Sequence, residues 1–234
     1  MVKNHLSKLA MPRTWPVNRK GEKFIIRPKS PHAFEACIPL GVVLRNILKY
    51  AKTTKESKMI LNTGDVLVNK KVRKDIKLGV GIMDVIEFPK LKAQFRILLN
   101  RQGKFIMHPI DAKEANIRPY KIKDKKILKG NKIQLNLEGG ENMLIKDDKF
   151  KPGDTLIMDT EKKAVHDHLK LEKGATVYIT AGNKVSSVGK VDSLKQLKGG
   201  RSNIIFVVDN KNVETNKDYA LVLGKDKPII SLPK

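Results

Sequence analysis

The candidates for a metal-binding, catalytic or nucleotide-binding role in this sequence are its five histidines, its single cysteine and the two glycines of a Gly-Val-Gly stretch. On a β-strand, His166 and His168 would share a face and could offer two ligands to a metal ion. A third ligand would still be needed, and no cysteine is nearby. Surface histidines flanking Asp167 are the simpler interpretation. Cys37 precedes an apolar stretch with no evident base partner in the sequence, which is more typical of a buried thiol than of a nucleophile.

The glycine pair lies in Gly79-Val-Gly81. A dinucleotide-binding loop needs a third glycine, and Asp84 stands at that position. The sequence has no phosphate-binding P-loop either. We therefore expect no enzymatic activity, no cofactor, no metal site and no small-molecule substrate.

The balance of charge points to a different kind of partner. The 234 residues include 48 Lys and Arg against 24 Asp and Glu, a formal net charge of +24. Such a charge disfavours a compact monomer and indicates a polyanionic partner. There are 39 lysines and nine arginines, and aromatic residues make up only 5%. Because lysine acts on phosphate as a mobile point charge and base stacking needs aromatic side chains, the composition favours contact with a nucleic-acid backbone.

Cysteine usage and hydropathy indicate the compartment. A single cysteine excludes an intrachain disulfide framework and fits a reducing environment. No stretch approaches the ~18 consecutive apolar residues that a membrane-spanning helix needs. The N-terminus is basic but lacks the apolar core of a secretory signal. We expect a cytoplasmic protein that enters no membrane.

Charge and turn residues predict an α+β, multi-domain chain. Residues 1–36 form a basic N-terminal arm, 37–101 a compact α+β module, 102–170 a central β-domain, and 171–234 a C-terminal β-barrel. Positive charge is densest in the first hundred residues, whereas the central part carries 15 basic and 11 acidic side chains. The central part is therefore expected to be a spacer or packing domain.

Prolines break any helix in the arm, and its basic side chains are spread between them. A segment with so little apolar surface cannot fold alone, so we expect it to order on a partner. A small apolar anchor is the exception, and its candidate members are Leu6, Leu9, Met11, Trp15 and Val17.

Two helices and a hairpin are predicted in the α+β module. The i, i+3, i+4 spacing of apolar residues predicts an amphipathic helix over 38–52. Thr53 and Glu56 have the spacing of a capping box, so a second helix is expected to begin there and to end at Gly64. Residues 65–73 predict a hairpin. The basic side chains expected on the outer faces of the two helices are Arg45, Lys49, Lys52, Lys55 and Lys58.

Short strands separated by Gly and Pro turns fill the rest of the chain. In the central part they are expected at 132–137, 143–145 and 155–158. In the last part they are expected at 176–180, 188–191, 204–208 and 219–223, which suggests a five-stranded SH3-like barrel. A basic loop at 194–201 includes Lys198 and Arg201.

The stretches at 5–15 and 38–50 closely resemble the S4e family of small-subunit ribosomal proteins of archaea and eukaryotes. The helix–helix–hairpin region at 38–75 is similar to that family's alpha-L RNA-binding motif, and residues 173–191 are similar to its KOW motif. The resemblance covers nearly the whole chain in the family's domain order. It implies a structural component of the small ribosomal subunit that binds ribosomal RNA, supports translation and meets neighbouring ribosomal proteins.

The resemblance also implies which residues contact RNA. In the arm these are Lys3, His5, Lys8, Arg13, Trp15, Arg19, Lys20, Lys23, Arg27 and Lys29. In the alpha-L module they are Arg45, Lys49, Lys52, Lys55, Lys58, Lys70, Lys71 and Arg73. In the KOW region they are Gly182, Asn183, Lys184, Gly189, Lys190, Lys198 and Arg201.

The sequence departs from the family pattern at two turns. The hairpin usually carries Gly where this chain has Lys70, and a type I′ turn needs a positive φ there. Either Lys70 is strained or the turn is looser. In the KOW loop, Ser186 and Ser187 stand where a Gly and an Arg are common.

Two other functions stay open at this point. Alpha-L modules also occur in pseudouridine synthases, but those RNA-modifying enzymes need a large catalytic domain with an essential Asp. KOW barrels also occur in transcription-elongation factors, although here the densest basic charge lies away from the predicted barrel.

Overall fold

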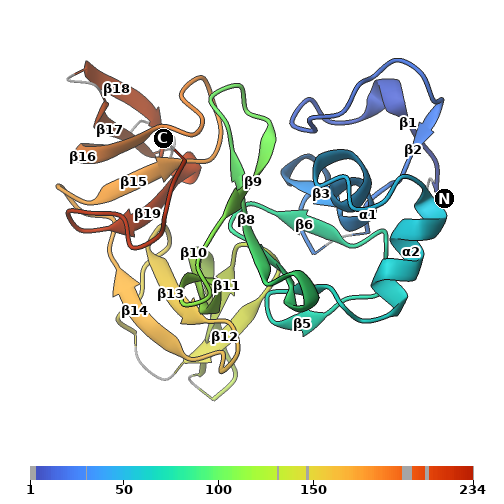
Figure 1. Ribbon diagram of the computed structural model, residues 1–234. Coiled ribbons are helices and arrows are strands. Elements are labelled where there is room, and N and C mark those ends of the chain that lie inside the picture. Colours follow the sequence, from blue (N-terminus) through green and yellow to red (C-terminus); the bar gives the residue numbers. More distant parts are fainter. Residues whose placement is uncertain are drawn as a thin grey trace. The chain divides into compact units, whose positions relative to one another are not determined.

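The computed structural model describes residues 4–29, 31–130, 132–145, 148–196, 202–208 and 211–233. The chain is mostly β-structure with few helices, and it divides into two compact units, residues 1–116 and 117–234 (Figure 1). We expected boundaries after residues 36, 101 and 170 instead. Whether those parts fold as separate domains stays a prediction.

The first unit contains three antiparallel sheets. Two of them are pairs of short strands: β1 (Leu6–Ser7) with β2 (Phe24–Ile25), and β3 (Cys37–Pro39) with β6 (Gly79–Gly81). The third runs in the order β5-β4-β7-β8-β9, with β4 (Leu67–Val68), β5 (Lys71–Val72), β7 (Val85–Phe88), β8 (Ala93–Leu99) and β9 (Phe105–Pro109). Because β9 pairs with residues 95–99 of β8, residues 105–109 lie in the first unit rather than with the strands that follow.

The helices of this unit are short. They are η1 (Lys8–Ala10), η2 (Phe34–Ala36), α1 (Leu40–Val42), η3 (Val43–Ile47), α2 (Thr54–Asn62), η4 (Pro89–Leu91) and η5 (Glu114–Asn116). The longest, α2, begins at the predicted Thr53 cap, and Gly64 follows it with φ of +80°. The prediction for α2 is therefore confirmed. None of the described helices is long and apolar enough to span a membrane.

The helix expected over 38–52 is much shorter than its apolar pattern suggested. One turn of α1 continues into the π-helical turn η3, which ends at Ile47. Lys49 then adopts a left-handed φ of 56°, and the backbone N–H of Tyr50 turns back to the carbonyl of Leu44 at 2.9 Å. A left-handed residue cannot continue a right-handed helix, so the helix ends here although apolar residues follow.

The N-terminal arm contributes to the core of the first unit. Trp15 is 2% exposed and donates from Nε1 to the carbonyl of Cys37 at 2.8 Å. Leu6, Met11 and Ile25 are also buried, and β1 pairs with β2. The expectation that this segment orders only on a partner is corrected. The apolar anchor and the β1–β2 ladder bury enough of it to hold it on the fold.

The second unit contains two five-stranded antiparallel sheets. One runs in the order β12-β11-β10-β13-β14, with β10 (Ile117–Leu128), β11 (Lys132–Leu137), β12 (Asn142–Ile145), β13 (Thr155–Asp159) and β14 (Val165–Leu169). The other runs β18-β17-β16-β15-β19, with β15 (Thr176–Ile179), β16 (Val188–Gln196), β17 (Ser202–Val208), β18 (Lys211–Asn216) and β19 (Ala220–Gly224), and η6 (Lys217–Tyr219) lies between the last two. The strands predicted in this half are confirmed, and β10, β14 and β18 are additional.

The two sheets of the second unit share an apolar core. Ile157 and Leu169 of the first sheet pack in one cluster with Val177, Phe206 and Val222 of the second. The remaining apolar face of the first sheet forms a second cluster around β10, β11 and β13. Apolar burial across the predicted boundary at residue 170 explains why both parts fall in one compact unit.

Candidate nucleic-acid interface

The first turn of α2 carries exposed lysines, and its acidic residue, Glu56, takes part in the N-terminal cap of the helix. Thr53 Oγ1 accepts a hydrogen bond from the Glu56 backbone N–H at 3.2 Å. Glu56 Oε2 accepts from the backbone N–H groups of Lys52 at 2.7 Å and Thr53 at 3.4 Å. These hydrogen bonds, first the one from Lys52 and then the one with the Thr53 side chain, lower the pKa of Glu56. The carboxylate thus serves the cap, while Lys55 and Lys58 are exposed.

The turn before α2 adds two more exposed lysines. Lys49 and Lys52 flank Ala51, which is buried, and Tyr50 packs edge-on against the ring of Phe88 with centroids 5.1 Å apart. Tyr50 and Ala51 therefore hold the turn to the fold and leave both lysines in solvent. We expected these lysines on a helix face with Arg45, and the structure places them in the turn after that helix instead.

Arg45 is engaged within the protein. Its NH1 donates to Thr54 Oγ1 at 3.1 Å, its Nε donates to Asn46 Oδ1 at 3.1 Å, and its NH2 lies 3.6 Å from Glu22 Oε2. The guanidinium is half-buried and connects the N-terminal segment to the start of α2. Its geometry favours a positioning role over a direct contact.

The hairpin of β4 and β5 turns through two left-handed residues. Asn69 has φ of 51° and Lys70 has φ of 63°, which is the conformation of a type I′ turn. Of the two alternatives left by the sequence, Lys70 therefore takes the strained backbone. Asn69 fixes the turn because its backbone N–H donates to the Val85 carbonyl and its Oδ1 accepts from the Val85 N–H, both at 2.9 Å.

The buried carboxylate of Asp84 stabilises this turn by accepting a hydrogen bond from Asn69. Asp84 is 2% exposed, and its Oδ1 accepts from Asn69 Nδ2 at 2.9 Å. Its Oδ2 accepts from the Gly81 backbone N–H at 2.7 Å and from His32 Nε2 at 2.9 Å. A side chain at Gly81 would come within 2.6 Å of the His32 ring, so this position requires glycine. Asp84 thus connects the hairpin turn, the β6–β7 turn and the N-terminal segment.

The basic residues of the hairpin differ in exposure. Lys70 Nζ donates to Glu87 Oε2 at 2.8 Å, and Glu87 is buried. Arg73 is half-buried, and its backbone N–H donates to the Val66 carbonyl at 3.1 Å. Lys71 is exposed. The hairpin therefore presents Lys71 most openly to solvent.

The N-terminal candidates divide into exposed and internal residues. Those exposed to solvent are His5, Arg13, Lys20, Lys23 and Lys29. Arg19 donates to the carbonyls of Leu9 and Met11, and the Arg27 guanidinium lies 5.5 Å from the ring centroid of Phe34. Lys3 lies outside the described residues.

Two N-terminal candidates are corrected by their burial. Trp15 packs in the core and uses its indole N–H on Cys37, so it has no face on which a base could stack. Lys8 is also buried, with Nζ 3.9 Å from Glu22 Oε2. Neither side chain offers a surface to RNA.

The loop between β15 and β16 is exposed at its tip. Gly182, Asn183 and Lys184 are in solvent, and Gly182 and Ser186 both have positive φ, 90° and 67°. The left-handed backbone of Ser186 is the conformation that glycine adopts most readily. Lys198 and Arg201 lie outside the described residues.

Two further candidates lie on β16. A Cβ at Gly189 would come within 2.3 Å of the Val207 carbonyl, so this glycine serves close strand packing. Lys190 Nζ bonds to Asp226 Oδ1 at 3.0 Å on the surface. Strand packing accounts for Gly189, and an ion pair within the chain accounts for Lys190.

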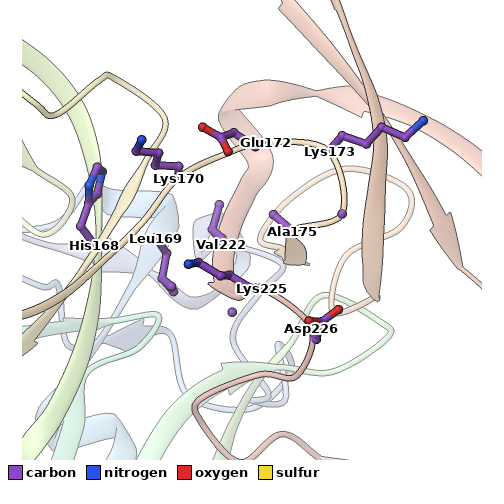
Figure 2. Close-up of a pocket in the computed structure, with 11 residues that line it drawn as sticks. His168, Leu169, Lys170, Glu172, Lys173, Ala175, Val222, Lys225 and Asp226 are labelled. Carbon is purple, nitrogen blue, oxygen red and sulfur yellow. The ribbon is translucent and has the colours of Figure 1, made fainter.

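A cavity of about 480 Å³ lies in the second unit between the segment around residues 168–175 and β19 (Figure 2). Its charged lining includes Lys170, Lys173 and Lys225 together with Glu172 and Asp226. Charges of both signs offset each other, and no convergent acid–base arrangement points to a reaction.

The two histidines of β14 have different surroundings. His166 is exposed, while His168 Nε2 bonds to Asp154 Oδ2 at 2.9 Å. Asp154 also accepts from the backbone N–H of Leu171 at 3.0 Å. Among the described residues, no group of three or more His, Cys, Asp or Glu could hold a metal ion.

Comparison with known proteins identifies the family. The profile described as ribosomal family S4e matches residues 91–165. The small ribosomal subunit protein eS4 of Methanosphaera stadtmanae is 40% identical over 98% of this chain and 96% of its own length. The protein of the same name from Archaeoglobus fulgidus is 38% identical over 99% of both chains. The chain belongs to the S4e family.

A solved structure supports the same assignment. The crystal structure of the 30S ribosomal protein S4e from Thermoplasma acidophilum superposes with a TM-score of 0.72 at 28% identity, covering 81% of this S4e chain and 96% of that one. The predicted resemblance to the S4e family is therefore confirmed.

Sequence reasoning missed two internal residues of this S4e chain. Asp84 was considered only as a missing glycine of a nucleotide loop, and its role as the acceptor for the hairpin turn needed the fold. Lys121 is buried and donates from Nζ to the carbonyls of Lys217, Asp218 and Ala220 at 2.8–2.9 Å. A lysine that begins a lysine-rich stretch gives no sequence signal for such a contact.

Proposed function

We propose that this S4e chain is a structural component of the small ribosomal subunit that binds ribosomal RNA through its phosphate backbone. Four exposed lysines at 49, 52, 55 and 58 carry the proposal, because they lie within one ordered turn and helix. The acidic residue among them, Glu56, is committed to the helix cap. The relatives' names support the assignment to the small subunit and hence to the cytoplasmic ribosome.

The finer architecture belongs to the same proposal. Helix α2, the helical turn before it and the β4–β5 hairpin support an alpha-L RNA-binding module. The five-stranded sheet formed by β15–β19 supports an SH3-like barrel with a KOW motif at its β15–β16 loop. RNA and neighbouring ribosomal proteins are the partners that follow. The relatives reported above are named as ribosomal proteins and not as enzymes, and we propose no catalytic step.

The mechanism is electrostatic and architectural. Each lysine that neutralises a phosphate releases a condensed counterion. The logarithm of the binding constant therefore falls linearly with the logarithm of the salt concentration, with a slope of about 0.7–0.9 per phosphate contact. The capping box and the packing of Tyr50 and Ala51 hold the lysine-bearing backbone in place before RNA arrives. Less conformational entropy is then lost on binding.

Reversing charge at three of these positions tests the proposal. The variant Lys49→Glu, Lys52→Glu, Lys55→Glu should weaken binding to small-subunit ribosomal RNA by roughly 100-fold at 0.15 M salt and lower the salt slope by about 2–3. Filter binding across a salt series measures both quantities.

A matched control separates this surface from the effect of net charge. Lys92, Lys104 and Lys113 are exposed in the same unit and lie outside the proposed contacts. Their reversal to Glu removes the same charge and should cost much less affinity. Equal losses in the two variants would show that binding follows net charge alone and would contradict the proposed interface.

A further inference from the structure

Positive charge in residues 102–170 is concentrated in one hairpin. Residues 121–137 contain six lysines and a single acid, Asp124. The rest of 102–170 contains nine basic and ten acidic residues. The near-neutral average of this part, which suggested a spacer, therefore conceals one strongly basic element.

That element is the hairpin of β10 and β11 (Figure 1). Strand β10 pairs with β13 over residues 117–121, and a bulge follows between Ile122 and Asp124. Beyond the bulge, β10 is hydrogen-bonded to β11 alone. Residues 118–122 are buried, whereas residues 123–130 are exposed except for the half-buried Lys125. Beyond the bulge, β10 thus leaves β13 and continues as an exposed strand at the edge of β11, which remains paired with β12 on its other side.

The six lysines separate into two sets. Lys121 donates to three backbone carbonyls in the interior, and Lys125 donates to the Phe150 carbonyl at 3.3 Å and pairs with Asp148. Both are thereby used within the fold. The other four are exposed, and no described carboxylate forms an ion pair with any of them: Lys123, Lys126, Lys129 and Lys132.

The strand register places neutral polar and apolar side chains beside these lysines. Lys126 lies opposite Gln134, which in turn lies opposite Leu144 on β12. In the next row, Leu128 lies opposite Lys132. The opposite face of β11 carries Ile133 and Leu135 into the core, so the row with Lys126 faces away from it.

The end of the hairpin is also apolar. Ile127 is 74% exposed and Leu128 is 40% exposed. Both side chains lie between the exposed Lys126 and Lys129 and leave apolar surface in solvent. They are suited to the sugar and base faces that a lysine-bound phosphate backbone brings close.

We propose that the β10–β11 hairpin is a second RNA-binding element, which inserts between phosphate-lined segments of ribosomal RNA. The inference rests on the proposed function and adds a binding site in residues 102–170, whose nearly balanced charge suggested a spacer. RNA is favoured over a protein partner because four exposed lysines without an ion pair to a described carboxylate share residues 121–137 with one acid, Asp124, which accepts a hydrogen bond from the Lys125 backbone N–H.

The test removes the four charges from the full-length chain. Replacing Lys123, Lys126, Lys129 and Lys132 with Gln should lower the salt slope for purified small-subunit ribosomal RNA by about 3 and the affinity at 0.15 M salt on the order of 100-fold. The matched control replaces the exposed Lys162, Lys163, Lys225 and Lys227 with Gln. It should retain most of the affinity. A variant with Arg at the four hairpin positions should bind as the parent chain does.

The outcomes distinguish this inference from the proposed function. If the hairpin variant binds like the parent while the variant reversed at residues 49, 52 and 55 loses affinity, the hairpin inference is overturned and the proposed function stands. Normal RNA binding combined with failed incorporation into small subunits would assign the hairpin to a protein partner and also overturn it. Loss in the hairpin variant, with retention in the control and the Arg variant, supports it.

Discussion

Replacing Asp84 with Asn should destabilise the first unit and its hairpin turn with almost no change in side-chain volume. The carboxylate accepts from Asn69 through Oδ1 and from Gly81 and His32 through Oδ2. An amide has one oxygen, so its NH2 group must face at least one of these donors. A buried donor left without an acceptor costs about 1–3 kcal/mol. Asp84→Ala, which leaves all three donors without this acceptor, should cost roughly 3 kcal/mol or more.

The chain offers a built-in probe for this measurement. Trp15 is its single tryptophan, is buried, and lies in the same unit as Asp84. Its fluorescence during urea unfolding reports the stability of that unit. With a denaturant dependence of about 1–3 kcal/mol per molar urea, a loss of 2 kcal/mol lowers the midpoint by about 1 M.

Asp65→Asn is the matched control. Asp65 pairs with the exposed Lys90 at 2.7 Å on the surface of the same unit, where solvent screening leaves an ion pair little effect on stability. If Asp84→Asn shifts the midpoint no further than Asp65→Asn, the carboxylate does not hold the turn, and our account of the positive φ at Asn69 and Lys70 fails.

Two further predictions concern buried titratable groups. Burial lowers the pKa of Lys121 from 10.5 to about 8, so above pH 8 the unfolded chain binds more protons than the folded one. Lys121 should therefore make the free energy of unfolding rise between pH 8 and about 10 by up to roughly 3 kcal/mol. Urea titrations of the Lys121→Met variant should lack this rise. Equal dependence of the unfolding free energy on pH in both chains would refute the assignment. Burial, with a smaller contribution from the Asp84 charge, raises the pKa of Cys37 to about 11. Iodoacetamide at pH 8 should label Cys37 only as fast as the first unit opens, and rapid labelling of the folded chain would contradict its burial.

Local chemistry predicted the elements that short sequence patterns specify. The capping box of Thr53 and Glu56 and the strand at 132–137 depend on neighbouring residues, and both appear as expected. The hairpin turn at Asn69 also appears, although the sequence left its backbone conformation open. The prediction of a helix over 38–52 was wrong in length because apolar spacing alone cannot show that Lys49 adopts a left-handed backbone. Backbone handedness at a non-glycine residue depends on tertiary contacts, here the packing of Tyr50 on Phe88.

Long-range contacts explain why the compact units differ from the expected boundaries and why the arm is held on the fold. Residues 105–109 join the first unit through pairing with β8, and Ile157 and Leu169 share a core with Val177. Neither contact has a signature in local sequence. Residue type and position in the chain predict exposed lysines such as Lys55 as contacts but cannot separate them from Lys8, which the fold buries.

Charge averaged over a predicted domain is a poor guide to where a polycation binds. A phosphate responds to charges within about a Debye length, roughly 8–10 Å at physiological salt, and not to the sum over seventy residues. In this chain the average for 102–170 combines a lysine-rich hairpin with acidic residues outside it, several of which are committed to turns and caps. Asp154, for example, accepts from the Leu171 backbone and from His168, and Asp159 accepts from the backbone of Glu161. These acidic residues keep their charge, but they hold it at turns outside residues 121–137, so the local surplus of lysines is what an approaching RNA would meet.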